Sequence, residues 1–168
     1  MKKLAGIFIL SSLLCSILFN QCKTKNQAVD LNSEAKPFEK LSDYHFFKGD
    51  LKQLIPNDRV LPYDLITTLF TDYAHKARFV WMPEGTSAQY TKDEALEFPV
   101  GAVLIKNFFY PIDFRDSTKG KKIIETRLLV KRKAGWDNLT YEWNDQQTEA
   151  TLNIIGDTKK VEFIDLHG

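Results

Sequence analysis

Residues 123–143 read IIETRLLVKRKAGWDNLTYEW, and this stretch decides the fold. From Ile123 to Arg132 the side chains alternate, so that one face collects mainly apolar residues while the other collects charged ones. Gly135 marks a hairpin turn, and the alternation resumes after it as far as Trp143. The pattern predicts an antiparallel hairpin with one apolar face. That face is expected to consist of Ile124, Thr126, Leu128 and Val130 in the first strand, and of Leu139, Tyr141 and Trp143 in the second.

Other segments of the chain extend the same architecture. Residues 98–110 are almost continuously apolar, which predicts a strand covered on both faces. Residues 63–73 place apolar side chains three and four positions apart, which predicts a short helix despite several threonines. Further strands are predicted at 77–81, 150–154 and 161–166, and a further short helix at 49–54. Strands joined by short turns are typical of a mainly β fold, so we expect an antiparallel β-sandwich or barrel with one or two short N-terminal helices.

The N-terminus has the pattern of an export signal. Two lysines precede an uncharged apolar run over residues 4–19, which is short for a bilayer-spanning helix. Cys22 follows shortly after it and precedes a polar stretch, which resembles a bacterial lipoprotein signal. We therefore expect a lipoprotein-type signal peptide over 1–21 and lipidation of Cys22. An uncleaved anchor and ordinary cleavage are the alternatives.

The remaining chain is expected to form a lipid-anchored protein of the bacterial cell envelope, facing the periplasm or the exterior. Residues 22–40 are polar without a sustained apolar period, which predicts a flexible tether. Residues 41–168 are then a single β-rich domain. The whole chain has 23 basic and 22 acidic residues, and this balance argues against nucleic acid as a partner.

Known catalytic and cofactor motifs are missing from the sequence. It contains no CxxCH, GxGxxG, Walker A, HExxH or GxSxG pattern. The three histidines, His45, His75 and His167, are too far apart to give a local metal-ligand spacing. We therefore expect no cofactor, no metal site, no catalytic residues and no catalytic activity of its own.

Three polar groups of residues are candidates for a polar pocket. Asp72 and His75 have the spacing of an acid/base pair on a helix, or of a solvated helix end. Asp113 and Asp116 could bind a hard cation, although the intervening Arg115 would neutralise them within an ordinary loop. Residues 144–149 either line a pocket or form a turn. The candidate pocket residues are Asp72, His75, Asp113, Arg115, Asp116, Asn144, Asp145 and Gln147.

Charge is distributed unevenly along the chain. Residues 115–133 carry eight basic and two acidic side chains, whereas residues 134–168 carry seven acidic side chains and two lysines. A basic hairpin could face an acidic partner or an anionic membrane. The alternative is that these charges lie on the outward faces of adjacent strands and pair with one another.

Residues 61–81, 98–111 and 125–148 resemble the N-terminal module of a family of exported bacterial proteins. Longer members resemble c-type cytochromes, with CxxCH segments after this module, and some are associated with sugar-dehydrogenase-like proteins. The resemblance covers about 41–168, and this chain ends about where the haem segment would begin. It implies the β-rich module without its haem segment, and it supplies no catalytic residues.

Two functions of different classes follow. The first is a non-catalytic module of an envelope redox system, which docks a c-type cytochrome or a dehydrogenase. The second is a ligand- or saccharide-binding β-sandwich lipoprotein, since aromatic rings stack on the apolar faces of sugars. Trp81, Trp136 and Tyr141 would then be candidate contact residues, although packing in the core is the alternative for each.

Overall fold

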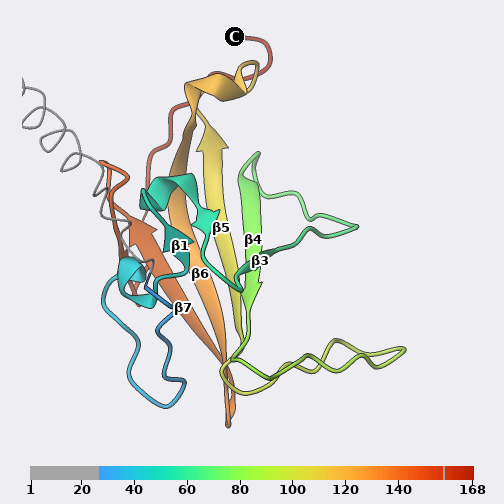
Figure 1. Ribbon diagram of the computed structural model, residues 1–168. Coiled ribbons are helices and arrows are strands. Elements are labelled where there is room, and N and C mark those ends of the chain that lie inside the picture. The colour runs from blue at the N-terminus through green and yellow to red at the C-terminus, as the bar shows by residue number, and fades with distance from the viewer. Residues whose placement is uncertain (1–26, 157) are drawn as a thin grey trace, which may run out of the picture.

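The computed structural model describes residues 27–156 and 158–168 (Figure 1). The predicted signal peptide and Cys22 lie outside the described residues, so cleavage and lipidation stay predictions. Strands dominate the described chain, and its helical turns are all of the 3-10 type. The elements are η1 (Leu41–Tyr44), β1 (Phe47–Lys48), η2 (Leu51–Gln53), β2 (Ile55–Pro56), β3 (Leu61–Pro62), β4 (His75–Trp81), β5 (Val103–Pro111), η3 (Ser117–Lys119), β6 (Lys121–Arg132), β7 (Gly135–Trp143) and β8 (Ala150–Leu152).

Six strands form one antiparallel sheet in the order β3-β4-β5-β6-β7-β8. Each strand pairs with its neighbour along the chain, and the predicted hairpin is β6 and β7. The outer strands β3 and β8 are edges of this sheet, which is therefore open and not a closed barrel. A small antiparallel sheet of β1 and β2 accompanies it. The prediction of a mainly β antiparallel fold is confirmed, in a sandwich-like arrangement.

A bulge corrects the predicted face of β6. Thr126, Leu128 and Val130 are buried as expected, but Ile123 is buried in place of Ile124. The register explains the change, because Phe108 pairs with Glu125 whereas Phe109 pairs with Ile123. Ile124 is the extra residue between these pairs, and an extra residue reverses the alternation beyond it.

One face of the large sheet forms the core. Phe79, Ile105, Leu128 and Leu139 occupy one row across β4 to β7, and all four are buried. The N-terminal elements η1, β1, η2 and β2 cover this face and lie in front of the sheet in Figure 1. Phe47 of β1 contacts Phe79 edge-on, with ring centroids 5.1 Å apart. The opposite face of the sheet, which we call the open face, has no covering sheet among the described residues.

The segment before η1 packs on the domain, which corrects the predicted tether from residue 27 onward. Val29, Leu31 and Phe38 lie against the core. The Asp30 amide donates to the Tyr44 carbonyl at 3.1 Å, and Arg132 donates to the carbonyls of residues 33 and 35. The apolar side chains in this segment are too widely spaced for a periodic pattern, yet each finds a place on the sheet.

The two predicted helices are reduced or absent. The expected helix at 49–54 is a single 3-10 turn, and it ends at Leu54, which has a positive φ of 54°. Residues 63–73 form no helix but a loop between β3 and β4, in which Asp72 and Tyr73 have φ values of 44° and 64°. This prediction was wrong because the apolar spacing has no surface to pack against, and three threonines oppose a helix.

Two strand predictions also need correction. Within 98–110 the strand begins only at Val103, and one of its faces is buried while the other is half-buried. Full coverage of both faces is thus wrong, because no second large layer lies on the open face. Residues 161–166 form only an isolated bridge between Ile164 and Asp113. None of the described helices is long and apolar enough to cross a bilayer.

Candidate functional site

A groove of about 720 Å³ opens at the end of the sheet where β4 begins and β5 ends, and we call it the end groove. His75 and Phe109 occupy paired positions of these strands, and their rings meet edge-on at 5.6 Å. Phe114 meets His75 at 5.4 Å from the following loop. Lys119 and Lys121 add cationic groups, and burial lowers the pKa of Lys121. Aromatic walls with a few polar groups are typical of ligand sites.

Asp113 lines the end groove, but its carboxylate is bound within its own loop. The side chain is 1% exposed. Its Oδ1 accepts hydrogen bonds from Arg115 at 3.0 Å, and its Oδ2 accepts from Arg115 at 3.1 Å and from Lys119 at 2.9 Å. The bonds from Arg115, followed by that from Lys119, hold the pKa of Asp113 well below its usual range. This arrangement supports the neutralised loop and contradicts the cation site.

Asp116 has a separate role in the same loop. Its Oδ1 accepts hydrogen bonds from the Thr118 amide at 3.0 Å and from the Thr118 hydroxyl at 2.6 Å. These bonds cap η3 and lower the pKa of Asp116. The loop from Asp113 to Gly120 is therefore held by its own polar side chains and presents a fixed wall to the end groove.

Asp72 and His75 form neither an acid/base pair nor the end of a helix. Their segment is not helical, and no hydrogen bond within the described chain joins the two side chains. The Asp72 carbonyl accepts from the Tyr110 hydroxyl at 3.1 Å, whereas the His75 ring packs against Phe109 and Phe114. His75 is thus an aromatic wall residue of the end groove.

The polar run after β7 is a turn that reaches the opposite wall of the groove. Gln147 accepts from the Ile123 amide at 2.6 Å and donates to the Ile123 carbonyl at 3.0 Å. Asn144 bonds Thr148 within the turn, and Asp145 lies 3.5 Å from Lys122. Gln147 therefore fastens the turn to β6, while Asn144 and Asp145 stabilise the turn and its surface.

The structure brings together three of the eight predicted pocket residues. His75, Asp113 and Gln147 line the end groove. Arg115 and Asp116 hold the loop that forms its wall, and the other three lie outside the lining. Phe109, Phe114 and Lys121 also line the groove, and no sequence pattern identified them as site residues. Phe109 was assigned to a strand buried on both faces, and no local pattern marks a loop aromatic such as Phe114 as its neighbour.

The aromatic region continues beyond the groove into the C-terminal segment. A cavity of about 240 Å³ lies between Tyr73, Phe114 and Phe163, together with Leu166. Phe163 stacks on Tyr110, with ring centroids 5.3 Å apart and planes at 11°. Residues at positions 73, 110, 114 and 163 are therefore neighbours, although nothing in the sequence relates them.

The loop over residues 63–74, which we call the apolar loop, borders the same end of the sheet. Two side chains of the sheet donate hydrogen bonds to carbonyls of the loop: Lys76 to that of Leu69 at 2.9 Å, and Tyr110 to that of Asp72. Figure 1 shows the loop reaching away from the sheet between β3 and β4. It nevertheless exposes large apolar side chains, with exposed fractions from 45% to 107%: Leu65, Ile66, Leu69, Phe70 and Tyr73.

The three aromatic residues proposed as sugar contacts do not form a site. Tyr141 is completely buried and bonds the Tyr44 hydroxyl at 2.9 Å, so it cannot meet a ligand. Trp81 and Trp136 lie toward the opposite end of the sheet from His75, and the end groove includes neither in its described lining. Core packing explains Tyr141, and Trp136 packs edge-on against Phe98.

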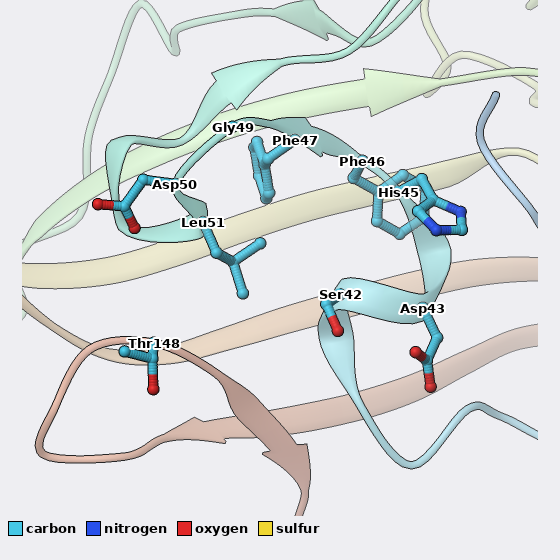
Figure 2. A pocket seen from close by; sticks show the side chains of 9 residues that line it. All are labelled: Ser42, Asp43, His45, Phe46, Phe47, Gly49, Asp50, Leu51 and Thr148. Carbon is cyan, nitrogen blue, oxygen red and sulfur yellow. The ribbon is translucent and has the colours of Figure 1, made fainter. Parts of the chain in front are cut away.

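A second cavity, of about 430 Å³, lies beside the N-terminal layer (Figure 2). It is bordered by Ser42 and Asp43 of η1, by residues 45–47 and 49–51, and by Thr148 of the turn before β8. The Nδ1 atom of His45 is buried there without a hydrogen-bond partner among the described atoms. Figure 2 shows Asp50 and His45 at opposite sides of this cavity, so its polar groups do not converge on one point.

The geometry as a whole supports binding. Aromatic and cationic side chains gather at one end of the sheet, and their polar neighbours are hydrogen-bonded to one another. Within residues 27–156 and 158–168, no group of three or more His, Cys, Asp or Glu side chains is placed to hold a metal ion. Compared with known proteins, the chain matches no family model, no curated protein and no solved structure.

Proposed function

We propose that this protein is an exported, lipid-anchored module of the bacterial cell envelope that docks a redox protein, a c-type cytochrome or a dehydrogenase, without catalysing a reaction itself. The apolar loop is the observation that carries the proposal. Five large apolar side chains in one exposed loop form a patch that a monomeric protein rarely presents without a partner.

The position of the apolar loop favours a protein partner over a small ligand. The loop projects from the sheet, whereas small ligands bind in concave sites. Phe70 and Tyr73 meet edge-on at 5.3 Å, so the loop presents a paired aromatic anchor. Aromatic residues of this kind are enriched at the centres of protein interfaces.

The start of the fold bears on the proposed anchor. If Cys22 carries the lipid, only the four residues 23–26 separate it from Gln27, whose carbonyl already accepts a hydrogen bond from Asn57. The five steps from Cys22 to Gln27 span at most about 17 Å even when the chain is fully extended. The domain would therefore lie close to the membrane surface, within reach of membrane-bound redox partners.

Site-specific photo-crosslinking tests this function. A photoreactive amino acid at position 70, in cells of the source organism, should give an adduct whose partner stains for covalent haem or carries a dehydrogenase. The same amino acid at exposed position 160, outside the apolar loop, is the control and should give no such adduct. Adducts at position 70 that contain only this chain, or no adduct at all, would contradict the proposal.

The end groove supports ligand or saccharide binding as a second candidate function. Its aromatic walls and its volume of about 720 Å³ suit a small polar ligand. Calorimetric titration with neutral oligosaccharides should detect binding that Phe114→Ala weakens and that Trp136→Ala leaves unchanged. Equal effects of both substitutions, or no binding by the native protein, would exclude this candidate.

A further inference from the structure

Three cationic side chains lie in cross-strand register on the open face of the sheet. Arg78 of β4 pairs with Lys106 of β5, and Lys106 pairs in turn with Arg127 of β6. Their chain neighbours Phe79, Ile105 and Leu128 point into the core. Because successive side chains of a strand alternate between faces, all three cations point to the open face. We call these residues the cationic row.

The cationic row is unfavourable in the isolated protein. Neighbouring strands are about 4.8 Å apart, and like charges directly opposite each other destabilise a sheet. Burial first, followed by the charges of Arg78, Lys76 and Arg127, lowers the pKa of Lys106. Arg127 has a carboxylate partner in Glu125 at 2.6 Å. Arg78 and Lys106 have no ion pair among the described residues, and Arg78 is only 7% exposed.

Apolar and aromatic groups flank the cationic row. The centroid of the Phe108 ring lies 4.7 Å from the Lys106 ammonium and 4.9 Å from the Arg127 guanidinium, so both cations contact one aromatic ring. On the other side, an apolar row crosses the same three strands and β3. It has two exposed members, Leu61 and Leu129, and its other members are Val80 and Leu104. The open face thus offers fixed positive charge beside an accessible apolar strip.

We propose that the cationic row binds a carboxylate-rich segment of a partner protein through Lys106 and Arg127, with apolar side chains of that segment on the adjacent strip. The buried Arg78 contributes its charge but no direct contact. Carboxylates satisfy guanidinium and ammonium donors directly. The net charge of the whole chain is only +1, which gives little of the long-range attraction on which a nucleic-acid polymer depends. The assignment of a protein as occupant rests on the proposed docking function.

The geometry also favours a protein over the membrane surface. The side-chain amide of Asn57 donates hydrogen bonds to the Gln27 carbonyl and to the His45 carbonyl of the covering layer. The chain therefore enters the fold on the covered side of the sheet, opposite the cationic row. If residues before Gln27 anchor the protein, the covered side of the sheet faces the membrane and the open face points away from it. The apolar loop, in contrast, is tied by Lys76 and Tyr110 to the open face itself.

Binding of poly-L-glutamate, a soluble polycarboxylate, tests the row even while the partner is unidentified. In amide chemical-shift titrations of the isotope-labelled protein, the largest shifts are expected at positions 106 and 127, whose side chains a ligand can reach. The double variant K106Q/R127Q should bind about tenfold more weakly, because two charge contacts are lost. The control K92Q/K133Q removes the same charge from exposed lysines elsewhere and should change the affinity less than twofold. K106R/R127K keeps both charges and should retain binding, which separates the loss of charge from a folding defect.

The other outcomes distinguish a failure of this inference from a failure of the proposed docking function. An equal loss in K92Q/K133Q would reduce the binding to non-specific charge and overturn the inference. A different outcome is that phosphatidylglycerol vesicles bind more strongly than poly-L-glutamate and lose this binding in K106Q/R127Q. That result would assign the cationic row to lipid and overturn the proposal that a protein binds there. If poly-L-glutamate binds the row as described but position 70 gives no redox adduct, the carboxylate site stands and the docking function fails. If the adduct forms equally in K106Q/R127Q and poly-L-glutamate does not bind, the inference alone fails.

Discussion

Replacing Leu128 by Ala tests the register on which both faces of the sheet depend. Leu128 is fully buried in β6, between Ile105 of β5 and Leu139 of β7. The substitution removes three carbons, which corresponds to about 2.4 kcal/mol of lost transfer free energy at about 0.8 kcal/mol per carbon. A residual cavity of about 50 Å³ would add about 1.2 kcal/mol. We therefore expect the free energy of unfolding to fall by about 3.5 kcal/mol.

The adjacent Leu129 provides a matched control. It loses the same atoms on replacement by Ala, but it lies on the open face and is 38% exposed. Its substitution should cost less than about 1 kcal/mol. Urea unfolding measures both variants, and at an unchanged slope the Leu128→Ala midpoint should fall by about 2 M. A larger loss for Leu129→Ala would refute the register, because a slip of one residue exchanges the two faces.

Three further predictions concern groups whose partners the structure identifies. Thr126→Val leaves the Asn107 Oδ1 and the Trp143 Nε1 without their buried hydrogen bonds, so it should lower the free energy of unfolding by about 2–4 kcal/mol; a loss below about 1 kcal/mol would speak against that network. Because its two cationic partners lower the folded-state pKa of Asp113, its carboxylate stabilises the fold above the unfolded-state pKa of about 3.9, and this contribution disappears as the pH falls toward the folded-state pKa. Asp113→Asn should therefore be less stable at pH 7 and lose less stability between pH 5 and 2, and parallel pH curves from urea melts would contradict this. Phe38→Ala should cost about 1–3 kcal/mol in the same melts, because the ring packs 4.9 Å from that of Tyr44, whereas a residue in a free tether would cost nothing measurable.

The central hairpin was predictable because its signal is local. Alternation over β6 and β7 places Thr126, Leu128 and Val130 in the core without reference to any other segment. The bulge at Ile124 was not predictable, because it depends on how β5 meets β6 beyond Phe108. A single inserted residue leaves no compositional sign in a run that already begins with two isoleucines.

The N-terminal segment and the apolar loop show two opposite ways in which the spacing of apolar residues fails to predict burial. Val29, Leu31 and Phe38 have no shared period, yet each packs on the core, because a segment that lies across a sheet needs only single contacts. Residues 63–73 have a helical period, yet no surface buries their apolar face. Apolar spacing alone does not distinguish a helix packed on its own domain from a loop that presents the same residues to solvent.

The candidate site depended on contacts between distant segments. The sequence identified His75, Asp113 and Gln147 only as members of separate polar runs, and the sheet brings them to one groove. Asp113 shows how local chemistry can still be recognised, since the nearby Arg115 correctly indicated a neutralised loop. The cationic row, in contrast, follows only from the pairing of three strands.

The outer strands of the large sheet decide in which direction this protein can associate. β3 has two residues, one of them Pro62, which has no amide hydrogen to offer an incoming strand, and β8 has three. Edge strands this short offer another chain too few free backbone groups for strand addition, so the sheet resists edge-to-edge aggregation. Recognition is thereby left to side chains on the flat surface and the projecting loop, where a partner can be selected by its charge and shape and released without unravelling either fold.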